Sequence, residues 1–179
     1  MTRAAALIAA LATAAPAAAA APSPFAGARL EGEFSMHARV TVAKNVVREH
    51  VGELLGRTWT FRPLCASGAC AQVQLVRNRA GGADVLTLSQ TTPGSYAGNG
   101  LFYAPLSCAG KTYARGESVP FRITVTITAE STVGFATAIK ATYVNPSRRN
   151  LTPCVDIPGH DAATYTGQLG APSTGGSGA

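Results

Sequence analysis

Acidic residues are scarce in this chain of 179 residues, which carries nine Asp and Glu against 15 Lys and Arg, and only three His. No two acidic residues are spaced as an obvious pair on one strand, which disfavours glycosidase chemistry. The sequence also has no H-E-x-x-H, no glycine-rich phosphate loop and no dinucleotide fingerprint. These absences lead us to expect no cofactor, no metal site and no nucleic-acid partner.

Signals for a nucleophilic hydrolase are equally sparse. There is no G-x-S-x-G elbow, and Ser67 has no evident base beside it. His37 lies between charged neighbours on a polar strand face, and His50 lies among acidic residues, so both are interpreted as solvated. The sequence therefore favours a protein that is not an enzyme.

The polar segment around His160 keeps a hydrolase open as the alternative. His160 and Asp161 are adjacent, so their side chains diverge and cannot form the oriented pair of a catalytic triad. A secreted hydrolase would have to assemble its site from scattered residues, with His160 meeting Glu117 or Asp156 in the fold.

Long hydrophobic runs are absent except at the N-terminus. Arg3 precedes an apolar run over residues 4–15, and Ala18, Ala19 and Ala20 supply small residues for a peptidase. This pattern predicts a signal peptide at 1–20, removed on export, because the run is too short to span a bilayer. We therefore expect a secreted protein, located outside the cell or in its envelope, with no transmembrane segment after cleavage.

The remaining chain suits one domain. We expect a linker at 21–29, a single β domain at 30–169, and a flexible tail at 170–179 composed of Gly, Ser, Pro, Thr, Ala.

Four cysteines behind an export signal predict two disulfides. We expect Cys65–Cys70, because the small residues and the Gly between them let the chain turn back, and Cys108–Cys154. The longer loop is worth about 4 kcal/mol in the chain-entropy estimate, against about 2 kcal/mol for the short one.

Strict alternation over 119–130 is the clearest structural signal. Phe121, Ile123 and Val125 fall on one face, and threonines fall on the other, as in a half-buried strand. We expect this strand to form a hairpin with 133–144, whose inner face carries Val133, Phe135, Ile139 and Tyr143. Further strands are expected at 30–42, 57–62, 71–79, 84–90, 95–104 and 162–169.

The fold class that follows is all-β, an antiparallel sandwich or small barrel of about eight to nine strands. One segment, 45–55, has apolar residues at helical spacing, so a short helix and an irregular loop are both open there. Trp59 precedes all four cysteines, which argues against an immunoglobulin domain.

Aromatic residues are the remaining clue to function. Trp59, Phe61, Tyr96 and Tyr103 could line a ligand cavity if the domain is a barrel, although core positions are the simpler interpretation. The sequence thus predicts a secreted binding or interaction domain, with a small apolar ligand or an anionic envelope component as its partner. A structural envelope protein held by its basic surface is a further alternative.

Overall fold

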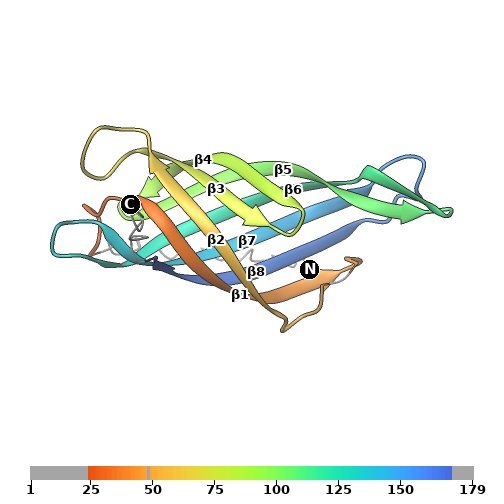
Figure 1. Cartoon of the computed structure of the whole chain (residues 1–179), viewed down its shortest axis with the longest axis horizontal. Helices are drawn as coiled ribbons and strands as arrows, with labels where there is room; N and C mark the ends of the chain where they lie inside the picture. The colour runs from red at the N-terminus through yellow and green to blue at the C-terminus, as the bar shows by residue number, and fades with distance from the viewer. Residues whose placement is uncertain (1–23, 48, 171–179) are drawn as a thin grey trace, which may run out of the picture.

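The computed structural model describes residues 24–47 and 49–170, and these form a closed barrel of antiparallel strands (Figure 1). Each strand pairs with the next one along the chain, and β8 closes the barrel against β1. Within the described ranges no helix is found, so none is long and apolar enough to cross a membrane. The strands are β1 (Gly32–Lys44), β2 (Leu54–Pro63), β3 (Gln72–Arg79), β4 (Gly82–Thr92), β5 (Ser95–Cys108), β6 (Lys111–Glu130), β7 (Ala136–Asn150) and β8 (Gly159–Leu169).

The core fills the barrel because apolar and polar residues alternate along the strands. In β6, Ile123 is completely buried, whereas the neighbouring Thr124 faces outward and its hydroxyl bonds that of Thr142. Aromatic rings pack in the middle, where the Phe34 and Phe61 centroids lie 5.4 Å apart. The all-β prediction is confirmed, and the choice it left open between sandwich and barrel is resolved as a barrel.

One local prediction was wrong in part: β6 and β7 form the expected hairpin, but Val133 and Phe135 do not face inward. Val133 is 77% exposed and Phe135 is 38% exposed, because residues 131–135 form a loop and β7 begins only at Ala136. Gly134 has a φ of 80° there, which closes the loop in a conformation that glycine adopts readily. Of the two structures left open for 45–55, the described part adopts the irregular loop, which ends where Leu54 and Leu55 begin β2 and pair with β1.

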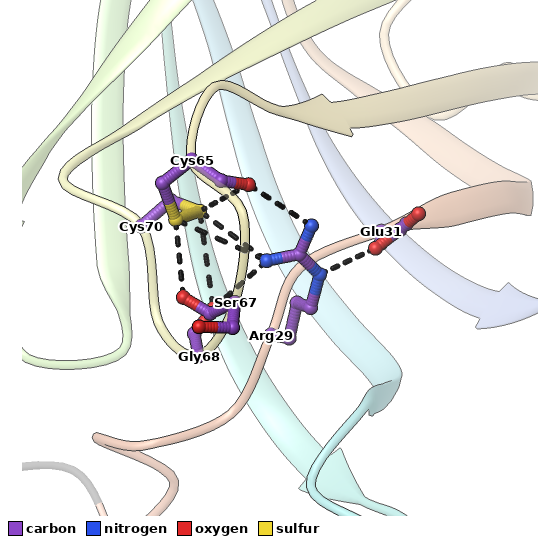
Figure 2. The surroundings of a disulfide bond; sticks show 6 residues. All are labelled: Arg29, Glu31, Cys65, Ser67, Gly68 and Cys70. Atoms are coloured by element: carbon purple, nitrogen blue, oxygen red, sulfur yellow. Dashed lines mark hydrogen bonds and ion pairs between the residues drawn. A yellow bond between two sulfur atoms is a disulfide. The ribbon is translucent and has the colours of Figure 1, made fainter.

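One end of the barrel, which we call the capped end, carries the β2–β3, β4–β5 and β6–β7 connections. The predicted Cys65–Cys70 disulfide is confirmed in the β2–β3 loop. Figure 2 shows the Arg29 guanidinium between this loop and Glu31, donating to the carbonyl oxygens of Cys65 and Gly68.

The segment before β1 packs against this capped end. Ala28 and Leu30 are 1% exposed, and the backbone of Arg29 pairs with that of Phe135. The predicted linker at 21–29 therefore ends in residues that pack on the barrel, Ala28 and Arg29. The predicted signal peptide at 1–20 and nearly all of the tail at 170–179 lie outside the described residues.

The opposite end, which we call the mouth, carries the β1–β2, β3–β4, β5–β6 and β7–β8 connections. The β5–β6 hairpin is long and projects beyond the other strands (Figure 1). The predicted Cys108–Cys154 disulfide is confirmed and joins this hairpin to the β7–β8 loop. It therefore fixes one rim of the mouth.

Candidate ligand cavity at the mouth of the barrel

A cavity of about 180 Å³ opens inside the barrel at the mouth. It continues outward into a wider hollow of about 670 Å³ beneath the β1–β2 loop and the β5–β6 hairpin. Leu55, Phe102 and Ala104 supply apolar lining, and Tyr143 and Tyr165 add aromatic lining. The remaining lining is unusually polar for the interior of a barrel and includes four arginines: Arg57, Arg77, Arg79 and Arg148.

Arg77 forms the floor of this cavity. Its guanidinium lies 4.4 Å from the centre of the Phe121 ring and 4.8 Å from that of Tyr143, within the range of cation–π attraction. A Cβ at Gly100 would overlap the Phe121 ring, so the glycine makes room for it. The aromatic layer of the core thus ends in a buried cation facing the cavity.

Asp84 holds two of the arginines. Its carboxylate accepts hydrogen bonds from Arg77 Nη2 at 2.6 Å and from Arg79 Nε at 3.0 Å. The residues come together because β3 and β4 are a tight hairpin in which Arg77 pairs with Asp84. Arg79 also lies over the Phe102 ring, with 4.2 Å between the guanidinium carbon and the ring centre.

Arg148 stands on the other side of the cavity between two carboxylates. Its Nε lies 3.2 Å from Glu117 on β6, and its Nη1 lies 3.6 Å from Asp161 on β8. It points inward because the pairing of β7 with β8 shifts between Asn145 and Arg148, which changes the face that later residues present. Arg148 is 6% exposed, so this is a buried charge cluster.

The carboxylates of this cluster are held away from water. Burial raises the pKa of Asp161 and that of Glu117, although Arg148 opposes both shifts. Burial also raises the pKa of Glu49, in the β1–β2 loop, and the Asp161 charge adds to the effect. Arg148 Nε and Asp161 Oδ1 take part in the ion pairs of this cluster, but neither atom has a well-aligned hydrogen bond among the described residues. Such atoms gain from a polar group that enters the cavity.

Arg57 differs from the other cavity arginines. Its side chain, on β2, makes no ion pair within the described part of the chain, and its Nη1 donates only to the carbonyl oxygen of Gly56. It lines both the inner cavity and the outer hollow. An incoming anionic group would meet this guanidinium without displacing a carboxylate.

The aromatic residues singled out from sequence lie elsewhere. Trp59, Phe61 and Tyr96 are at most 1% exposed and belong to the core. Tyr103 faces outward beneath Arg115, whose guanidinium carbon lies 3.8 Å from its ring centre. None of the four lines the cavity, although the Trp59 ring packs against the lining residue Tyr165 at 4.8 Å between centroids.

The acidic residues proposed to meet His160 in a hydrolase site instead pair with arginines. Asp161 and Glu117 both face Arg148, and Asp156 pairs with Arg149 on the surface. No hydrogen bond joins the His160 side chain to a carboxylate or hydroxyl in 24–47 or 49–170, and no cluster of metal-binding side chains occurs there. The residues meet as ion pairs rather than as a triad.

The outer surface of β6, β7, β8 and β1 carries a second, shallow feature. Its threonines form rows across the strands, as in Thr124, Thr142 and Thr164, and its basic side chains are His37, Arg39 and Lys140. The lining of this shallow surface contains no carboxylate. It is therefore a basic, hydroxyl-rich face.

Comparisons with known proteins point to no relative. A scan of the sequence against protein-family models gave no match, and a search of curated proteins gave none either. The function is therefore inferred from the residues of the cavity.

Proposed function

We propose that this protein is a secreted binding domain, not an enzyme, and that the cavity at the mouth holds a small ligand. The observation that carries the proposal is the cavity itself: a space that opens at the end of a closed barrel and is lined by aromatic rings and positioned charged groups. Such a combination is typical of small-molecule sites, which occur preferentially in the mouths of barrels. Export is supported by the signal-peptide pattern, and the two disulfides are compatible with it.

The charged groups favour binding over turnover. Each buried carboxylate of the mouth faces an arginine, as Asp84 faces Arg77 and Asp161 faces Arg148. An ion pair of this kind fixes side chains and presents charge, whereas a general base needs a proton acceptor directed at the substrate. The cavity therefore recognises a ligand by charge and shape.

The test is a binding screen with classes of small molecule: amino acids, dicarboxylates, sugars, aromatic acids and diamines. Fluorescence can report binding, because Trp59 is the single tryptophan and contacts the lining residue Tyr165. Hits are then measured by calorimetry in the wild type and in Ala104→Trp, which places a large ring between the inner cavity and the outer hollow. Ala114→Trp, on the exposed part of β6, is the matched control.

We expect at least one class to bind saturably to the wild type and to Ala114→Trp, and to lose binding in Ala104→Trp. The proposal fails if no class binds, or if the Ala104→Trp variant binds as well as the wild type.

A second candidate function is attachment to an anionic envelope polymer, and the basic face on β6, β7, β8 and β1 favours it. His37, Arg39 and Lys140 lie there among threonine hydroxyls. Retention on immobilised polyphosphate, compared between the wild type and the Arg39→Gln/Lys140→Gln variant, tests this. Equal retention of the two would exclude the face as the attachment site.

A further inference from the structure

The charged residues of the mouth are sorted between opposite halves of the barrel. On the β2–β4 half, Arg57, Arg77 and Arg79 stand against one carboxylate, that of Asp84. Among these arginines, Arg57 has no ion-pair partner in the described ranges. This half of the cavity therefore presents a net positive charge to its contents.

The β6–β8 half has the opposite excess. There Glu117 and Asp161 stand against Arg148, and Glu49 reaches the same cluster from the β1–β2 loop. Asp161 and Glu49 line the inner cavity, and Glu117 lines the outer hollow. Strands β5 and β1 separate β2–β4 from β6–β8 in the strand order, so Asp161 and Glu117 lie across the barrel from Arg77. Glu49 lies between the two halves, in the β1–β2 loop, where the charge of Arg57 acts on it and partly lowers its pKa.

From this arrangement we propose that the ligand is a small zwitterion, with its anionic group toward Arg57 and its cationic group toward Glu49 and Asp161. The inference rests on the proposed function, because it names the ligand class of the same cavity. A ligand of a single charge would satisfy one wall and meet repulsion at the other, whereas a zwitterion is complementary to both.

The volume of the cavity and its apolar lining restrict the class of ligand further. A dry cavity of about 150 Å³ holds a benzene molecule, so a space of about 180 Å³ suits about six to ten non-hydrogen atoms. Between the charged walls the lining is apolar, from Leu55, Phe102 and Ala104. These features fit a short hydrocarbon segment that carries its opposite charges at its two ends.

The buried carboxylates support the same assignment. Burial raises the pKa of Glu49 and of Asp161 because it outweighs the stabilisation that nearby arginines give to their charged forms. An ammonium group beside them would add to that stabilisation.

The probes are ω-amino acids, from 3-aminopropanoate to 6-aminohexanoate, measured by calorimetry on the full-length exported protein. Each is compared with the carboxylic acid and the amine of the same chain length, such as pentanoate and pentylamine for 5-aminopentanoate. We expect one ω-amino acid to bind at least tenfold more tightly than both matched compounds.

Two variants assign the ends of the ligand. Arg57→Gln should weaken that ω-amino acid about tenfold and should not weaken the matched amine, because it removes the anion-binding group, which repels a cation. Glu49→Gln should weaken the ω-amino acid and should not weaken the matched acid, because the carboxylate that it removes repels an anion. The controls are Arg62→Gln, exposed on β2, the strand that also carries Arg57, and Glu33→Gln, exposed on β1, the strand that precedes the loop of Glu49. Thermal unfolding verifies that every variant is folded.

The outcomes separate the two proposals. The zwitterion proposal is wrong if a matched acid or amine binds as tightly as its ω-amino acid. It is also wrong if only a sugar or another uncharged compound binds and Ala104→Trp abolishes that binding. In both cases the cavity remains a ligand site. If nothing in the screen binds, both proposals fail.

Discussion

Arg77 and Asp84 are paired neighbours on β3 and β4, and their side chains meet inside the barrel with 2.6 Å between Nη2 and Oδ2. Arg77 is 5% exposed and Asp84 is 8% exposed, so the pair is largely shielded from bulk water. The same carboxylate also binds Arg79. One acidic residue thereby positions two arginines of the proposed ligand cavity.

Replacing Asp84 with Asn should therefore destabilise the fold strongly. Removing one partner of a buried ion pair leaves an uncompensated charge, at a cost of about 3–5 kcal/mol. Urea unfolding measures the loss, and Asp156→Asn is the control, because its partner Arg149 lies on the surface. An equal loss in the two variants would show that the Arg77–Asp84 pair is effectively solvated.

The alternation of β6 leads to a second prediction. Ile123 is completely buried, so Ile123→Ala should cost about 2–5 kcal/mol through lost transfer energy and packing. Thr124→Ala, one residue along on the outer face, should cost far less. Similar losses at both positions, measured by urea unfolding, would contradict the assignment of inner and outer faces.

The sequence was sufficient to predict much of the barrel. The period-two pattern of 119–130 identifies β6 because its inner face is almost wholly apolar and its outer face is rich in threonine. The small residues between Cys65 and Cys70 likewise predicted that bridge. Both signals come from residues that are close together in the chain, so they can be recognised in one sequence without knowledge of the fold.

The site could be predicted only in part, because it depends on pairing between distant segments. Arg77 continues the inward series of Val73 and Leu75, so its parity alone points into the barrel. Arg148 gives no such signal, since a shift in strand pairing turns it inward. The long β5–β6 hairpin was also missed beyond residue 104, because Gly, Pro and polar residues there interrupt the alternation.

A third prediction concerns the disulfide at the mouth. The Cys108→Ser/Cys154→Ser variant should lose about 2–5 kcal/mol of stability, because the bridge closes a long loop. The Cys65→Ser/Cys70→Ser variant should lose less, since it opens a loop with a sequence separation of five. Chemical unfolding under non-reducing conditions compares them, and a larger loss for the short loop would contradict the argument.

The fourth prediction is a dependence on pH. Burial raises the pKa of Asp161 above its ordinary value, against the opposing effects of Arg148, the Tyr143 hydroxyl, Arg77 and His160. The folded protein then retains a proton that the unfolded chain releases, so this contribution to stability is full below about pH 3.9 and is lost as pH rises through the folded pKa.

Asp161→Asn cannot titrate at this position. The stability of the wild type relative to Asp161→Asn should therefore be greatest at about pH 3.5 and should decrease toward about pH 7. Urea unfolding of both proteins at the two pH values measures this difference. A wild-type advantage that increases with pH would mean that Arg148 outweighs burial.

The central claim is that the mouth cavity holds a small ligand, and native mass spectrometry of the exported protein tests it most directly. We predict that the wild type and Ala114→Trp carry an additional non-covalent mass that collisional activation releases, and that Ala104→Trp carries none. The account is contradicted if the wild type has only the mass of the polypeptide with its two disulfides, or if Ala104→Trp retains the same added mass.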